Sequence, residues 1–153
     1  MSELVEGVWA SSAPELADLH ARCFEVGWSA QDISSLLVLP GCTALACRRD
    51  DAFVAMAMFR RAVDEAELLT LATDPEHRRQ GLAERVLAQG EASLEKQGVV
   101  RVFLEVSERN SGAHALYERC GYREIACRRA YYRDGSDARV LEKWLRNDGQ
   151  TAP

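Results

Sequence analysis

The spacing of apolar and polar residues along the chain predicts a mixture of strands and helices. Leu82, Val86, Gly90 and Leu94 recur every four residues, which is the spacing of one face of a helix. Apolar runs that are too short for a helix and end in glycine, proline or aspartate are typical of buried strands. The predicted strands cover residues 5–9, 43–48, 52–59, 65–73, 99–106, 122–130 and 139–145.

Capping signals mark where the helices begin. Ser12, followed by Pro14 and Glu15, has the form of a capping box, and Ser29 opens a second helix by the same logic. The third helix is the one that begins near Leu82. Asn110 caps a fourth, which ends at a glycine.

The order of these elements is strand, helix, helix, three strands, helix, strand, helix, two strands. It predicts an α/β fold, with a mixed central sheet of about seven strands flanked on both faces by about four helices. No repeat, low-complexity segment or linker divides the chain. We therefore expect a single domain over residues 1–146 and a disordered tail over residues 147–153.

Composition favours a soluble globular protein of the cytoplasm. The chain has 153 residues, and its longest apolar run is interrupted by Pro40-Gly41 and is too short to span a bilayer. The first residues lack the basic and then apolar order of a signal peptide. The five cysteines form no C-x-x-C pair, which predicts reduced thiols rather than disulfides. No metal site is expected, because the three histidines stand apart from the cysteines, and His20 is interpreted as a core residue.

The net charge of −5 hides an asymmetry between the two ends of the chain. Residues 1–76 carry thirteen acidic and five basic side chains, whereas residues 119–146 carry four acidic and eight basic ones. A nucleic-acid-binding protein is normally more basic, so no direct binding to nucleic acid is expected. The acidic half is either a site that attracts a cationic substrate or an ordinary solvated surface.

Between the strand that ends at Thr73 and the helix that begins near Leu82 lies a short basic loop with one glycine, Arg78-Arg79-Gln80-Gly81. The first four N–H groups of a helix have no partner inside the helix, and the helix dipole favours negative charge there. Gly81 lacks the Cβ that would block close approach. The loop therefore has the chemistry of a pyrophosphate-binding site. It is neither a Walker loop nor a dinucleotide fingerprint, since both need further glycines.

The pattern Arg-x-x-Gly-x-Ala over residues 78–83 resembles the acyl-CoA-binding signature of the GNAT superfamily of N-acetyltransferases, and the predicted order of elements is similar to that fold. The second half of the chain resembles the branch of ribosomal-protein-alanine N-acetyltransferases. The matching segments are Phe103–Val106, Asn110, Ala115–Glu118, Gly121-Tyr122 and Arg128–Tyr132.

The resemblance implies a role for each matching residue. Glu105 would be the general base, and Tyr117 the general acid that protonates the leaving thiolate. The residues that would bind acetyl-CoA are Leu71, Ala72, Thr73, Arg78, Arg79, Gln80, Gly81, Leu82, Ala83, Glu84 and Asn110. Trp28, Tyr131 and Tyr132 would shape the slot for the acceptor.

Ordinary structural roles compete with these assignments. Strand alternation turns Glu105 away from Leu104 and Val106, so its carboxylate could be merely exposed or paired with an arginine. A tyrosine on an apolar helix face, such as Tyr117, is more often part of the core. The chain also departs from the branch, since Ala83 replaces the commoner glycine and Gly27 stands where the branch often has proline.

The leading hypothesis is an acetyl-CoA-dependent N-acetyltransferase. It would act by direct attack in a ternary complex on the N-terminal α-amine of an alanine, in a small-subunit ribosomal protein. The first alternative is an acetyltransferase for a small amine or amino acid, and the second is a non-catalytic acyl-CoA-binding module. Cys120 is the candidate for a rival covalent mechanism, although the C-terminus of a helix disfavours a thiolate. A monomer or weak dimer is expected.

Overall fold

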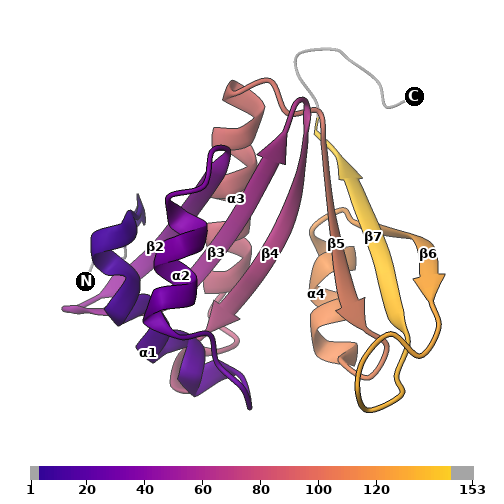
Figure 1. Cartoon of the computed structure of the whole chain (residues 1–153), viewed down its shortest axis with the longest axis horizontal. Helices are drawn as coiled ribbons and strands as arrows, with labels where there is room; N and C mark the ends of the chain where they lie inside the picture. The colour runs from indigo at the N-terminus through magenta and orange to yellow at the C-terminus, as the bar shows by residue number, and fades with distance from the viewer. Residues whose placement is uncertain (1–3, 146–153) are drawn as a thin grey trace.

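A seven-stranded sheet forms the centre of the molecule, which is represented by a computed structural model that describes residues 4–145 (Figure 1). The spatial order of the strands is β1-β2-β3-β4-β5-β7-β6, and β4 and β5 are the one parallel pair among the described strands. The strands are β1 (Leu4–Gly7), β2 (Cys42–Arg49), β3 (Ala52–Ala62), β4 (Glu65–Thr73), β5 (Arg101–Ser107), β6 (Arg123–Arg128) and β7 (Ala138–Trp144).

Helices cover both faces of this sheet, as the sequence predicted. The helices are α1 (Ala13–Cys23), α2 (Ala30–Leu37), α3 (Leu82–Lys96) and α4 (Ser111–Arg119), with 3₁₀ turns at Ala10–Ser12 and Pro75–His77. One buried cluster joins α3 and α4 to the sheet, and a second joins α1 and α2 to the opposite face of β2–β4. The mixed α/β fold with seven strands and four helices is thus confirmed.

Two of the three predicted N-caps form. The Ser29 hydroxyl accepts a hydrogen bond from Asp32 N at 3.0 Å, and Asn110 Oδ1 accepts one from Ala113 N at 3.1 Å. Ser12 makes no side-chain cap, so the predicted capping box is wrong. The reason is that a 3₁₀ turn runs into α1 and gives Ser12 helical backbone angles (φ −89°, ψ 0°), whereas a cap needs extended ones. The predicted tail over 147–153 lies outside the described residues.

The strands β4 and β5 pair only at their beginnings. Their register has three pairs, which join residues 65–67 to residues 101–103, and after Glu67 and Phe103 the strands diverge (Figure 1). A bulge lies close to this point, because Phe59 pairs with Leu68 but Met58 pairs with Thr70. A bulge bends its strand and increases the twist, so the extra residue, Leu69, turns β4 away from β5. The result is a V-shaped gap between the C-terminal ends of two parallel strands.

No helix in the described part of the chain combines the length and the apolar character needed to cross a membrane.

Gly90 marks the closest contact between α3 and the sheet. A Cβ at this position would lie 2.2 Å from the ring of Phe59, which is fully buried in β3. Overpacking a core costs about 1–3 kcal/mol, whereas alanine gains up to about 1 kcal/mol over glycine in a helix. We therefore expect Gly90→Ala to lower the free energy of unfolding, measured by denaturant titration. Gly112→Ala in α4 is the control, because a Cβ added there would have no neighbouring atom within 4 Å. Equal effects of the two substitutions would contradict this account.

Candidate functional site

The loop before α3 presents unpaired backbone N–H groups to solvent. Gly81 is the N-cap and has a left-handed backbone (φ 77°), and no side chain caps the helix. Arg79 also has a positive φ of 65°. The first bond of the helix runs from Arg85 N to Gly81 O at 3.1 Å, which leaves the N–H groups of residues 82–84 without helical partners. Left-handed residues in such a turn aim N–H groups inward, which makes an anion-binding concavity.

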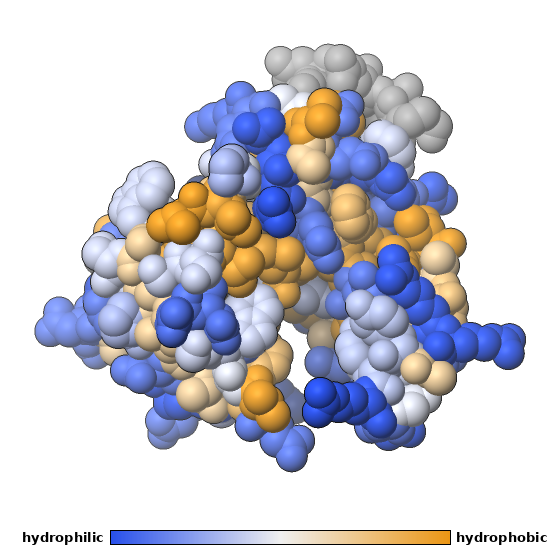
Figure 2. All heavy atoms as spheres, in the orientation of Figure 1, coloured by the Kyte–Doolittle hydropathy of each residue, from blue (hydrophilic) through white to orange (hydrophobic). Residues whose placement is uncertain are grey.

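A cleft of about 590 Å³ joins this helix start to the diverging end of β4 and to α4. It contains every residue predicted to bind acetyl-CoA except Gln80, and it also contains Tyr117. The predicted residues that line it are Leu71, Ala72, Thr73, Arg78, Arg79, Gly81, Leu82, Ala83, Glu84, Asn110 and Tyr117. In the space-filling view, the surface is hollowed between the side that carries α1 and α2 and the side that carries β6 and β7 (Figure 2).

The end of β4 offers polar groups to this cleft. The Thr73 carbonyl oxygen accepts hydrogen bonds from Arg78 Nε and Cys23 Sγ, each at 3.3 Å. The Thr73 hydroxyl is buried and has no protein partner. Buried polar groups are normally hydrogen-bonded, so an orphaned hydroxyl in the wall of a cleft fits a site that a polar ligand completes. The residues present therefore fit a long ligand with an anionic end at α3 and polar groups along β4.

Tyr117 lies on the buried side of α4 and is 8% exposed. Its ring meets the ring of Tyr122 edge to face, with 5.9 Å between the centroids. Burial raises the pKa of the Tyr117 phenol well above its ordinary value, and nearby Cys120 and Tyr132 add to the effect. The phenol is therefore protonated at neutral pH, so its O–H group is present as a donor in the cleft.

Glu105 lies on the other face of the sheet, as strand alternation predicted. Its Oε2 atom is 3.7 Å from Arg128 Nε, and it is buried without a hydrogen-bond partner. The distance is too long for a hydrogen bond, and the Arg128 side chain is 58% exposed. The carboxylate is thus near an arginine, as one simple alternative proposed, but its side chain is only 21% exposed. One of its oxygens nevertheless remains available to a donor that the protein does not supply.

Tyr132 interacts electrostatically with both Glu105 and Tyr117. Its pKa is raised by partial burial and by the charge of Glu105, and Tyr132 in turn contributes to the raised pKa of Tyr117. It therefore lies within electrostatic reach of both residues, which are on opposite faces of the sheet. Tyr131 packs edge to face against Tyr132 and is 51% exposed.

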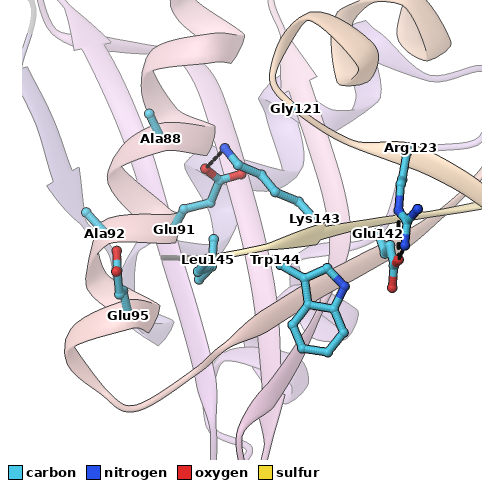
Figure 3. Close-up of a pocket in the computed structure, with 10 residues that line it drawn as sticks. All are labelled: Ala88, Glu91, Ala92, Glu95, Gly121, Arg123, Glu142, Lys143, Trp144 and Leu145. Carbon is cyan, nitrogen blue, oxygen red and sulfur yellow. Dashed lines mark hydrogen bonds and ion pairs between the residues drawn. The ribbon is translucent and has the colours of Figure 1, made fainter. Parts of the chain in front are cut away.

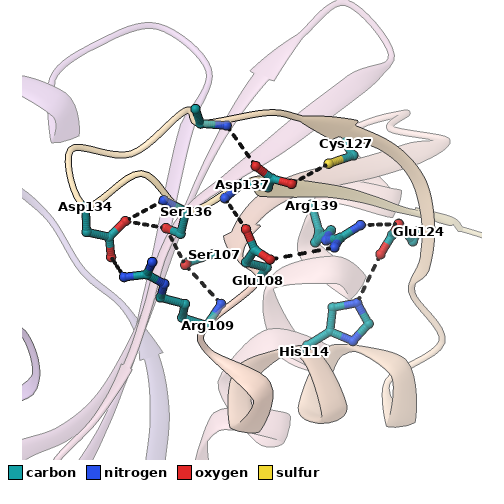
Figure 4. A network of polar contacts seen from close by, with 11 residues as sticks. Ser107, Glu108, Arg109, His114, Glu124, Cys127, Asp134, Ser136, Asp137 and Arg139 are labelled. Atoms are coloured by element: carbon teal, nitrogen blue, oxygen red, sulfur yellow. Dashed lines mark hydrogen bonds and ion pairs between the residues drawn. The ribbon is translucent and has the colours of Figure 1, made fainter.

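A polar network holds the loop that carries these tyrosines (Figure 4). Asp137 Oδ1 accepts a hydrogen bond from Ala130 N at 2.8 Å, and Asp137 N donates to Glu108. Asp134 forms an ion pair with Arg109 at 3.3 Å and accepts a hydrogen bond from Ser136 N. The loop between β6 and β7 is thus fastened to the turn between β5 and α4, which fixes Tyr132 relative to Glu105.

Trp28 does not line the large cleft. Together with residues of α2, it lines a shallow hollow of about 400 Å³, and its ring stacks on His20 at 4.7 Å. Its predicted contact with the acceptor stays a prediction. Among the described residues, no group of three or more His, Cys, Asp or Glu side chains is placed to hold a metal ion.

The structure adds six residues to the cleft that the motif did not include: Cys23, Phe24, Gly112, Ala113, Leu116 and Arg119. The last four belong to α4, whose apolar face could have been extended to the cleft from the positions of Asn110 and Tyr117. The first two lie at the end of α1. No signal in the sequence places that helix end beside the loop before α3.

His20 is a neutral core residue, as interpreted from the sequence. Its ring lies between the rings of Phe24 and Trp28, at 4.3 and 4.7 Å. Nδ1 accepts a hydrogen bond from Trp28 N at 3.0 Å, so Nε2 carries the proton and donates to the Thr70 hydroxyl at 3.1 Å.

Stability is expected to depend on pH through His20. Burial lowers its pKa below the usual value of 6.5. The unfolded chain then takes up a proton first, so the stability that His20 contributes is complete above about pH 6.5 and is lost as pH falls below it. Asp74 and Glu142, whose pKa values are lowered, lose their contributions only nearer pH 4. Denaturant titrations should show that the free energy of unfolding of the wild type falls between pH 7.5 and pH 5.5. The His20→Gln variant, which is less stable at both pH values, should lack this decrease. An equal decrease in the two proteins would contradict this role of His20.

A second cleft, of about 520 Å³, lies between α3 and β7 (Figure 3). Glu91 projects into it and accepts hydrogen bonds from Lys143 Nζ and from the Tyr122 hydroxyl, both at 2.7 Å. Glu142 is held there by Arg123 and Arg101. These carboxylates are already paired with cations, and none of the predicted site residues lines this cleft. The first cleft is therefore the candidate active site.

Comparison with known proteins identifies the family of the chain. The model of the acetyltransferase (GNAT) family matches residues 13–122. The [ribosomal protein bS18]-alanine N-acetyltransferase of Escherichia coli K12 is 40% identical over 89 residues, which cover 57% of this chain and 60% of that protein. The matched part thus spans less than two thirds of this relative.

Solved structures extend the likeness to nearly the whole chain. The crystal structure of the ribosomal-protein-S18-alanine N-acetyltransferase from Escherichia coli superposes with a TM-score of 0.87 and 28% identity, and covers 99% of this chain and 100% of its own. The PaiA N-acetyltransferase from Thermoplasma acidophilum, in complex with coenzyme A, shares the fold, with a TM-score of 0.81 and 18% identity over 95% of this chain and all of its own. From the family match, which covers well over half of its residues, the chain belongs to the acetyltransferase (GNAT) family.

Proposed function

We propose that the protein is an acetyl-CoA-dependent N-acetyltransferase that acetylates the N-terminal α-amine of an alanine in a small-subunit ribosomal protein. The observation that carries the proposal is that Tyr117 lines the large cleft, while Glu105 lies on β5, which diverges from β4 beside that cleft, with its side chain on the opposite face of the sheet. The similarity to the bS18-alanine N-acetyltransferase supports the choice of acceptor.

The donor side of the site is the large cleft. The pyrophosphate of acetyl-CoA would lie at the start of α3, where the N–H groups of residues 82–84 and the guanidinium groups of Arg78 and Arg79 favour an anion. The pantetheine arm would follow residues 71–73 of β4. When bound, acetyl-CoA supplies the acetyl group as a thioester. The main-chain N–H groups at the end of β4 are suited to stabilise the negative charge that develops on the carbonyl oxygen.

The acceptor side is the face of the sheet opposite to α3 and α4. We call it the open face at β5, where Glu105 lies, because α1 and α2 pack on β2–β4. Tyr132 lies within electrostatic reach of Glu105 there.

An α-amine has a pKa of about 8 and is mostly protonated at neutral pH, so it must lose a proton before it can attack. Glu105 takes that proton. The neutral nitrogen then attacks the carbonyl carbon through the gap, and Tyr117 protonates the sulfur as the C–S bond breaks. Because its pKa is raised, Tyr117 carries its proton at neutral pH and has an O–H group to offer to the sulfur.

The cysteines near the site do not support a covalent route. Cys23 lines the cleft, but burial raises its pKa, and its thiol donates to Thr73 O. Cys120 caps the C-terminal end of α4, and burial and the charge of Glu84 raise its pKa. Both are therefore thiols at neutral pH, whereas a nucleophile must be a thiolate. Direct attack is the mechanism that the site favours.

The test is acetyl transfer to defined acceptors, followed by release of the free thiol and by the mass of the product. The acceptors are a peptide with the N-terminal sequence of a bS18 protein, the same peptide with its α-amine blocked, and a panel of small amines. One acetyl group added to the free peptide, and none to the blocked one, is expected. Turnover of small amines alone would replace the proposed acceptor. Binding of acetyl-CoA without any turnover would reject the catalytic function.

A further inference from the structure

Glu67 lies beside Glu105 at the apex of the gap. It pairs with Phe103 in the last register pair of β4 and β5. Paired residues on adjacent strands point to the same face, and so do residues two apart on one strand. Glu67 and Glu105 therefore share the open face, while Ala66, Val102 and Leu104 face the core under α3 and α4.

The two carboxylates are close enough to interact. Glu105 lies two residues beyond Phe103, the last residue of β5 that pairs with β4, and two long glutamate side chains on the same face can converge across the start of the gap. The pKa of Glu67 is raised, first by partial burial and then by the charge of Glu105. Arg60, which pairs with Glu67 from β3, and Arg128 from β6 act in the opposite direction without cancelling this shift.

Among the described residues, no guanidinium group is hydrogen-bonded to either carboxylate, although Arg60 and Arg128 lie near them. Arg128 is 3.7 Å from Glu105 and mostly exposed. Among the described residues, no ion pair involves Glu67. The carboxylates of Glu67 and Glu105 share one face of the sheet, and the buried Oε2 atom of Glu105 has no hydrogen-bond partner. Such a pair suits a small ligand group that carries a positive charge and several N–H donors.

We propose that Glu67 and Glu105 together bind the ammonium group of the acceptor, and that Glu67 holds the cation while Glu105 removes its proton. The inference rests on the proposed function, because it assigns the acceptor amine to this face. One N–H bond of the ammonium group breaks, its proton goes to Glu105, and the electron pair stays on nitrogen for the attack. Glu67 remains a carboxylate throughout and contributes to binding.

Kinetics with a matched control test this role. Glu67→Gln should raise the KM for the acceptor about tenfold, change kcat less than threefold, and leave the KM for acetyl-CoA unchanged. Glu65→Gln is the control, since Glu65 lies two residues earlier on the same face but is paired with Arg101 at 2.9 Å. It should change none of these values. An unchanged acceptor KM in Glu67→Gln, or an equal change in Glu65→Gln, would overturn the inference.

Binding without turnover separates this inference from the proposed function. Calorimetry in the presence of coenzyme A would compare the Ala-start peptide with its Nα-acetylated form, and a small primary amine with its acetamide. Wild-type protein should prefer at least one of the charged forms, and Glu67→Gln should reduce that preference about tenfold. Which of the two charged ligands, the peptide or the small amine, the wild-type protein binds in preference to its acetylated form tests the proposed acceptor. The absence of any such preference, or its persistence in Glu67→Gln, refutes the role of Glu67.

Discussion

Glu105→Gln is expected to lower kcat by about 10²–10⁴-fold, the usual contribution of a positioned general base. Glutamine keeps the size of the side chain but cannot accept the proton of an ammonium group. The deficit should shrink above about pH 8, where the α-amine of the acceptor is already neutral. Steady-state rates between pH 6 and 9.5 with the Ala-start peptide measure both effects.

Two results would contradict this role. One is a kcat equal to that of the wild type, and the other is a deficit that stays constant with pH. Glu118→Gln is the control, because Glu118 is an exposed residue of α4 that is paired with His114 at 3.1 Å. The folded state of each variant can be checked by its denaturant midpoint. Little change is expected for Glu105→Gln, because the mostly exposed Arg128 forms only a long contact with the carboxylate.

Tyr117→Phe is expected to lower kcat by about 10²-fold or more and to leave the KM for acetyl-CoA nearly unchanged. The substitution removes the hydroxyl that would protonate the leaving sulfur, while the buried ring keeps its contact with Tyr122. Pre-steady-state measurement of thiol release shows whether the chemical step is the one that slows.

The neighbouring tyrosine provides the matched comparison. Tyr122→Phe also removes one buried hydroxyl, but that hydroxyl is bonded to Glu91 at 2.7 Å and points toward the second cleft. Tyr122→Phe should lower the free energy of unfolding, since Glu91 loses a hydrogen bond, and it should have little effect on kcat. Equal kinetic effects of the two substitutions would mean that Tyr117 contributes only packing.

Sequence reasoning was most successful where structure depends on local signals. The α3 pattern, the Asn110 and Ser29 caps and the strand alternation that turns Glu105 from the core each depend on a few adjacent residues. The predicted cap at Ser12 was wrong, because the preceding residues already form a helical turn. The sequence pattern of a capping box does not reveal the backbone conformation of the residues that precede it.

Features that depend on distant residues could not be predicted in this way. The bulge at Leu69 exists only through the pairing of β4 with β3, and the separation of β4 from β5 follows from it. The placement of Tyr132 near both Glu105 and Tyr117 depends on the loop contacts of Asp134 and Asp137. The proximity of Glu67 to Glu105 likewise depends on a parallel register that joins segments far apart in the chain.

The gap between β4 and β5 also has a consequence for product inhibition. Because donor and acceptor would approach from opposite faces of the sheet, each product would leave on the side from which its substrate came. Free coenzyme A would then compete with acetyl-CoA but not with the peptide, and the acetylated peptide would compete with the peptide but not with acetyl-CoA. The gap between β4 and β5 thus favours random release of the two products, because neither product would block the exit of the other.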